Sequence, residues 1–133
     1  MTSFEVRTGG RAQMLDITSQ VQRALGESGV RDGACVVYVP HTTAGVTINE
    51  NADPSVVTDI LAGLEQMAPR DAGYRHREGN ADSHIKATLT GFSQTIPVRD
   101  GRLVLGTWQG IFFCEFDGPR TRTVLVSVLP AGV

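Results

Sequence analysis

Short apolar runs, either continuous or alternating with polar residues, predict many strands and few helices in this chain. Residues 34–39 are apolar throughout, which is typical of a strand covered on both faces, and Pro40 ends this run. Gly9–Gly10 separates the first two alternating runs and predicts a hairpin, while Asp100–Gly101 predicts a second hairpin through a type I′ turn. The strands expected from this pattern are residues 4–8, 14–17, 34–39, 45–49, 92–99, 102–108, 111–116 and 123–129.

Two segments carry apolar residues at helical spacing behind a capping residue. The first begins at Thr18 as N-cap and ends within residues 26–29. Its inward stripe is Val21, Ala24 and Leu25. The second begins at Asp53, an N-cap, followed by Pro54 at the first helical position. Its apolar stripe is Val57, Ile60, Leu61, Leu64 and Met67.

A third, shorter helix is expected after a long loop. Residues 68–82 are rich in Pro, Gly and charge, and a loop of this length in a compact domain is often functional. Asp82 or Ser83 would cap the helix, and Gly91 would stop it. Together these elements predict an α+β fold with mainly antiparallel sheets and two or three short helices, in one domain spanning residues 1–133.

The amino-acid composition argues against several classes of function. The 133 residues include 12 Lys plus Arg and 14 Asp plus Glu, a balance that argues against a nucleic-acid platform or a membrane-surface binder. No apolar run reaches the roughly 20 residues that a membrane span needs, so we expect a cytoplasmic protein. Cys35 and Cys114 lie in apolar runs and are expected to be buried free thiols. Because a chain of this length folds without a structural metal, any bound metal would serve function.

The three histidines lie in polar or Gly-rich contexts. His41, His76 and His84 could provide three imidazole ligands to a divalent ion that keeps one open position. The alternative is that they are surface or singly hydrogen-bonded residues, because their spacing alone is weak evidence. Gly79–Asn80 would break a helix between the last two and could fold them together.

Polar residues also gather at the expected strand ends around residues 41–53. Thr42 and Thr43 offer two hydroxyls beside His41, and an amide and a carboxylate follow at Asn49 and Glu50. Asp53 is explained by helix capping, although a helix N-terminus there would also favour an anion. Glu50 has no such structural explanation and could act as a general acid or base.

Late in the chain, aromatic, amide and basic residues lie around turns. Trp108 beside Gln109 is more often a core residue than a stacking platform. Arg120 could bind a phosphate in a fork geometry, although Arg122 in that role, or plain solvent exposure of Arg120, fits the sequence equally well. The sequence has none of the motifs GxxxxGK[ST], GxGxxG after a strand, HExxH, GxSxG or CxxC, so the corresponding nucleotide, zincin, hydrolase and redox assignments lack support.

Four strings in order along the chain resemble the YjbQ family, and the resemblance runs from about residue 4 to residue 129. These strings are HTTAG at 41–45, NENADP at 49–54, GNADSHIK at 79–86 and GTWQGI at 106–111. The resemblance implies a small α+β protein that associates as a homotrimer. The family is labelled secondary thiamine-phosphate synthase because some members show that activity.

The resemblance also implies roles for particular residues. A divalent metal, zinc by expectation, would be held by His41, His76 and His84. The catalytic candidates are Asn49, Glu50 and Asp53. The candidates for substrate binding are Thr42, Thr43, Gly79, Asn80, Trp108, Gln109 and Arg120.

The expected function is therefore a metal-dependent transferase of the thiamine-phosphate synthase type. It would join an aminopyrimidine diphosphate to a thiazole phosphate and release pyrophosphate, with Glu50 in the mechanism. Two alternatives stay open on the sequence: a trimeric metal-binding protein whose synthase activity is incidental, and a metal-assisted hydrolase. The expected partner is a phosphorylated small molecule, with neither nucleic acid nor membrane.

Overall fold

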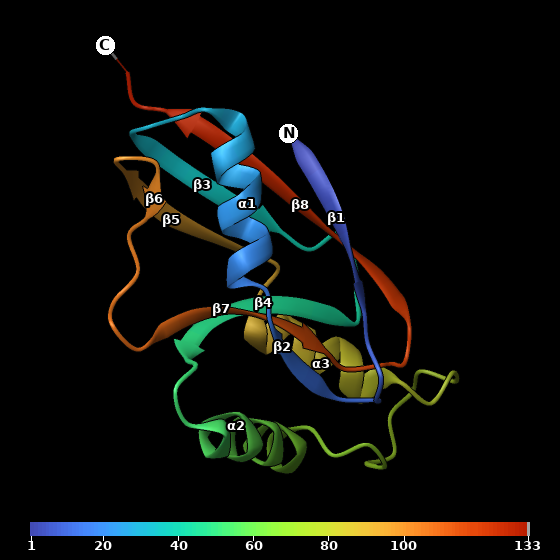
Figure 1. Ribbon diagram of the computed structural model, residues 1–133. Coiled ribbons are helices and arrows are strands. Elements are labelled where there is room, and N and C mark those ends of the chain that lie inside the picture. The colour runs from blue at the N-terminus through green and yellow to red at the C-terminus, as the bar shows by residue number, and fades with distance from the viewer. Residues whose placement is uncertain (133) are drawn as a thin grey trace.

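The computed structural model describes residues 1–132 and contains two antiparallel sheets and three helices (Figure 1). The larger sheet has the order β1 (Thr2–Arg7), β8 (Thr121–Pro130), β3 (Gly33–Tyr38), β5 (Ser93–Arg99) and β6 (Arg102–Leu103). The smaller sheet has the order β2 (Gln13–Asp16), β7 (Gln109–Glu115) and β4 (Ala44–Glu50). The predicted α+β class with antiparallel sheets is confirmed.

The smaller sheet is covered on both faces, and alternation along β7 shows how. Ile111 and Phe113 point into the main core with the larger sheet and helix α1 (Thr18–Ser28). Phe112 and Cys114 point to the opposite face, where helices α2 (Pro54–Met67) and α3 (Ala81–Thr90) pack. Figure 1 shows these two helices together on the far side of the smaller sheet. The doubly covered strand is therefore β7.

The prediction that residues 34–39 are covered on both faces is wrong. Cys35 and Val37 are fully buried, whereas Tyr38 is 46% exposed. Only one face of β3 packs in the core, because Cys35 and Val37 contact helix α1 and the smaller sheet while Tyr38 stays open.

The predicted hairpin around Gly9–Gly10 is also wrong. β1 pairs with β8 in the larger sheet, and β2 pairs with β7 in the smaller one. The two glycines carry the chain from one sheet to the other. Long-range pairing determines the partners of these two strands. A short strand is stabilised more by pairing with a strand already packed in a core than by pairing with its neighbour in the sequence.

Helix α1 begins as expected but is capped differently. Thr18 is its first residue and makes no capping bond for it; the Asp16 carboxylate accepts from the Thr18 N–H at 2.9 Å and from its hydroxyl at 2.6 Å. The Thr18 hydroxyl oxygen in turn accepts from the Ile111 N–H at 2.9 Å. The predicted stripe is confirmed, because Val21, Ala24 and Leu25 are the buried residues of the helix. Gly29 ends it in the left-handed conformation.

The predicted start is confirmed for α2 and wrong for α3. The Asp53 carboxylate accepts from the Ser55 N–H at 2.9 Å and caps α2, as expected. α3 begins at Ala81 after Asn80, so neither Asp82 nor Ser83 is its cap. Both side chains are instead buried and bonded to other elements.

The Asp100–Gly101 turn is confirmed, with φ of 53° and 73°, but β6 is only two residues long where seven were expected. Cys35 and Cys114 are buried free thiols, as predicted. Trp108 is 63% exposed, so its assignment to the core is wrong. Within residues 1–132 we find no helix long and apolar enough to cross a membrane.

Candidate functional site

Three segments that are distant in sequence meet at one end of the smaller sheet and form a polar pocket of about 360 Å³. One segment joins β3 to β4, the second leads into and through the first turn of α3, and the third joins β7 to β8. Each of the three segments adjoins the end of a strand or a helix, so packed secondary structure holds the segment in position. The lining residues are Pro40, His41, Thr42, Thr43, Glu78, Asn80, His84, Asp117, Arg120 and Arg122.

His41 is held in one tautomer. Its Nε2 accepts a hydrogen bond of 2.9 Å from the Thr123 N–H, so the neutral ring carries its proton on Nδ1. Burial, and then the nearby Arg122 guanidinium, lower the pKa of His41 below its ordinary value. At neutral pH the imidazole can therefore offer a ligand one N–H donor and no free lone pair.

Below the pocket lies a buried ion pair. Arg122 donates from Nε to Glu115 at 2.9 Å and makes a second contact through Nη2, and both side chains are almost inaccessible. The Arg122 Nη2 also donates to the Thr43 hydroxyl at 2.9 Å, while the Thr8 hydroxyl donates to Glu115 at 2.8 Å. Burial opposes ionisation of Glu115, but the Arg122 bonds outweigh it and lower the pKa of this carboxyl. The pair therefore stays charged and fixes the loop that carries Thr43.

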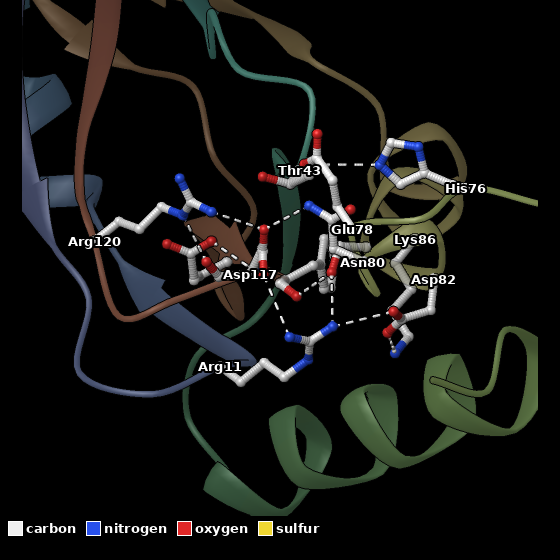
Figure 2. A network of polar contacts seen from close by, with 12 residues as sticks. Arg11, Thr43, His76, Glu78, Asn80, Asp82, Lys86, Asp117 and Arg120 are labelled. Atoms are coloured by element: carbon white, nitrogen blue, oxygen red, sulfur yellow. Dashed lines mark hydrogen bonds and ion pairs between the residues drawn. The ribbon is translucent and has the colours of Figure 1, made fainter. Parts of the chain in front are cut away.

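Asp117 is shared among several donors on the pocket wall (Figure 2). Its carboxylate accepts from Asn80 Nδ2 at 2.8 Å, from Arg120 Nη2 at 2.9 Å and from Arg11 Nη1 at 3.3 Å. Because Asn80 donates its amide to Asp117, its Oδ1 must act as an acceptor. That buried oxygen has no hydrogen-bond partner among the described residues. An unpaired buried acceptor in a pocket is a place for a ligand donor or a water.

A second ionic cluster anchors α3 behind the pocket (Figure 2). Lys86 donates to Asp82 at 2.9 Å and to Glu65 of α2 at 2.6 Å, and Arg11 donates to Asp82 at 3.1 Å. Asp82 and Lys86 are buried although charged. The Ser83 hydroxyl donates to the Phe116 carbonyl at 2.5 Å and ties the same turn to the end of β7. These contacts hold Asn80 and His84 in position at the pocket.

The expected three-histidine metal site is not formed. His76 and His84 do come together, with ring centroids 5.3 Å apart at 81°. His76 faces Glu78 at 3.8 Å and lines a separate hollow, whereas His84 lines the polar pocket with His41. The lone pair of His41 Nε2 is occupied by Thr123. Across residues 1–132, no three His, Cys, Asp or Glu side chains are grouped to hold a metal ion.

The candidates Asn49, Glu50 and Asp53 lie at the other end of β4 from His41, about 20 Å away for a strand of this length. Glu50 pairs with Gln109 across the sheet, and the Asn51 N–H donates to the Trp108 carbonyl at 3.0 Å. The polar motifs thus form two separate groups at opposite ends of the smaller sheet.

The substrate-binding candidates divide accordingly. Thr42, Thr43, Asn80 and Arg120 line the polar pocket, while Gly79 lines the hollow beside His76. Trp108 and Gln109 belong to the other group, where the Gln109 side chain accepts from the Gly106 N–H at 2.8 Å.

Sequence reasoning did not identify several residues that build the pocket. Arg122 was an equal alternative to Arg120, and it is the buried one. Glu115 carries a signal that the motifs do not use, because a lone carboxylate inside the apolar run 111–116 needs a buried partner. Asp117 lies in a turn before Gly118–Pro119, where an acidic residue is ordinary, so the sequence carries no signal that sets it apart.

Comparison with known proteins gives consistent matches along nearly the whole chain. The family described as "UPF0047 protein YjbQ-like" matches residues 2–131. A UPF0047 protein of Methanocaldococcus jannaschii is 53% identical over 126 residues, 95% of this chain and 91% of the relative. The YugU protein of Bacillus subtilis is 48% identical, covering 97% of this chain and 98% of its own.

Solved structures agree. A YjbQ/UPF0047 protein of Clostridium acetobutylicum superposes with a TM-score of 0.95 at 53% identity, covering 97% of this chain and 100% of that chain. A protein of Sulfolobus solfataricus, described as being of unknown function, gives a TM-score of 0.94 at 35% identity, covering 98% and 96%.

These findings overturn the expected activity. The relatives carry a family designation without an activity, and the structures are described as those of uncharacterised proteins or proteins of unknown function. Together with the missing metal-ligand group in the described part of the chain, they give no support to a thiamine-phosphate synthase, a zinc transferase or a three-histidine metal protein. The metal-dependent assignment and its metal-based alternatives are therefore wrong.

The family assignment itself is secure. The match spans nearly the whole chain, and relatives at about half identity share both its length and its fold. The chain belongs to the YjbQ family, UPF0047.

Proposed function

We propose that the protein binds a phosphorylated small molecule in the polar pocket. The observation that carries this proposal is the state of His41, a neutral imidazole whose Nε2 is occupied by the Thr123 N–H and which offers an Nδ1–H donor. A fixed, uncharged donor suits a phosphate oxygen, because it adds a hydrogen bond without having to gain or lose a proton.

The pocket lining carries two carboxylates, Glu78 and Asp117, and two guanidiniums, so an anion would be held by the free edge of Arg120 and not by a net positive charge. Arg120 is bound through Nε and Nη2 to Asp117, and its side chain is 53% exposed at the rim. Its Nη1 has no partner in the stretch from residue 1 to 132. A guanidinium oriented by a carboxylate is well suited to hold a phosphate oxygen, since its donors are already aligned.

Because Asn80 Oδ1 is a buried acceptor without a partner among the described residues, a ligand in the pocket should carry a hydrogen-bond donor for it. A phosphate monoester near neutral pH is partly singly protonated and carries a P–OH group, and the sugar or alcohol part of many such molecules carries hydroxyls. Either would satisfy this acceptor. The pocket volume of about 360 Å³ is within the range of small-molecule sites.

Isothermal titration calorimetry with methyl phosphate tests the proposal. We expect saturable one-site binding, and we expect Arg120→Gln to weaken it about tenfold, the effect of losing one charge-assisted hydrogen bond. The matched control is Arg99→Gln, which removes an exposed arginine at the end of β5. Absence of saturable binding to the wild type, or equal losses in the two variants, would overturn the proposal.

Other expectations from the sequence stay predictions. The homotrimer rests on the family resemblance and is measured by light scattering in solution. A divalent metal cofactor, a cytoplasmic location and the absence of nucleic-acid or membrane partners stay predictions from the sequence.

A further inference from the structure

A second hollow adjoins the polar pocket on the other side of the His41 loop. It measures about 370 Å³ and shares Pro40, His41 and Thr42 with the polar pocket. Its remaining lining consists of Tyr38, Val39 and Phe92, and it is therefore mainly apolar. One loop thus separates a polar and an apolar compartment, and a single small molecule could lie across it.

The apolar compartment is held by strand ends. The Val39 N–H donates to the Phe92 carbonyl at 2.8 Å, which locks the end of β3 against the segment entering β5. Val39 is fully buried beneath the hollow, and Tyr38 remains 46% exposed beside it. An exposed aromatic ring next to a rigid apolar floor provides a surface on which a flat apolar group can pack.

We propose that this hollow binds the organic group of the phosphorylated ligand, and that the ligand is a phosphate monoester of an aromatic alcohol. This inference rests on the proposed function, because the phosphate must lie in the polar pocket for the ring to reach the hollow. His41 and Thr42 lie at the boundary between the two compartments, where the ester oxygen would sit.

The test compares methyl phosphate with phenyl phosphate by calorimetry. We expect phenyl phosphate to bind about tenfold more tightly, the ratio that corresponds to roughly 60 Å² of ring surface leaving water. Tyr38→Ala should reduce this ratio to about twofold while leaving the affinity for methyl phosphate unchanged. Tyr38→Phe should retain the ratio, and Trp108→Ala, which removes an exposed aromatic residue at the other end of the sheet, should leave it unaltered.

The outcomes separate the two proposals. Saturable binding of methyl phosphate with no gain for phenyl phosphate would overturn the aromatic subsite and leave the phosphate pocket standing. A gain that persists in Tyr38→Ala and in a second variant, Phe92→Leu, would also overturn it. Failure of both compounds to bind would overturn both proposals.

Discussion

At the scale of single residues, the pocket is defined by groups whose hydrogen-bonding state is fixed by their neighbours. His41 is the clearest case, since a backbone N–H from β8 selects its tautomer and burial keeps it neutral. The sequence identified His41 as a site residue, but the histidine count suggested a metal ligand. Only the position of Thr123, 82 residues away, shows that one ring nitrogen is already in use.

Nuclear magnetic resonance of ¹⁵N-labelled protein tests this state directly. We expect His41 to show the tautomer protonated at Nδ1 at pH 7, and to titrate below the ordinary histidine pKa, because burial and Arg122 oppose its charge. Free histidine in the same buffer serves as the reference. A His41 ring protonated at Nε2, or one titrating above the ordinary histidine pKa, would contradict the assignment.

The Glu115–Arg122 pair makes the second prediction at this scale. Glu115→Ala leaves the Arg122 guanidinium buried without a counter-charge, so we expect it to lower the free energy of unfolding by about 3–5 kcal/mol in denaturant titrations. Glu115→Met combined with Arg122→Leu removes both charges and should cost less than the single change. Glu5→Gln, at an exposed position on β1, is the control. A loss under about 1 kcal/mol for Glu115→Ala would show that the pair contributes little.

At the scale of elements, local signals succeeded where the structure is decided locally. Asp53–Pro54 correctly predicts the start of α2, and Asp100–Gly101 correctly predicts a hairpin turn whose two φ angles are both positive. The errors occur where long-range contacts compete. Gly9–Gly10 is typical of a hairpin turn, yet β1 and β2 join different sheets, where they pair with β8 and β7.

Helix α3 illustrates the same limit and yields a prediction about pH. Its first turn carries Asp82, which does not cap the helix but bonds to Lys86 and Arg11. Burial would raise the pKa of Asp82, but these hydrogen bonds and charges lower it overall. A carboxyl with a depressed pKa in the folded state stabilises the protein above its unfolded pKa, and this contribution is lost as the pH falls through the folded pKa. We therefore expect the stability difference between wild type and Asp82→Asn to shrink from pH 7 toward pH 3, measured by denaturant unfolding. A difference that does not change with pH would argue against an ionic role.

At the scale of the whole molecule, the arrangement of the two sheets decides which motifs can act together. The hydrophobic pattern predicted the fold class and the four family strings predicted one site, but the two ends of β4 lie at opposite ends of the smaller sheet. Asn49 and Glu50 therefore lie beside Gln109, while His41 to Thr43 lie beside Asp117 and Arg120. The strand expected at residues 45–49 already places residues 41–43 and residues 49–53 at opposite ends, so this division could be predicted from the sequence.

The central claim is that the compartment around His41 and Arg120 is the binding site for a phosphate ester. The most direct measurement is a titration of ¹⁵N-labelled protein with methyl phosphate, followed by the backbone amide shifts. We expect saturable shifts confined to residues 41–43, 80–84 and 117–122, with a midpoint about tenfold higher in methyl phosphate concentration for Arg120→Gln. Shifts centred on residues 49–53 and 106–109, or no saturable shifts at all, would contradict the claim.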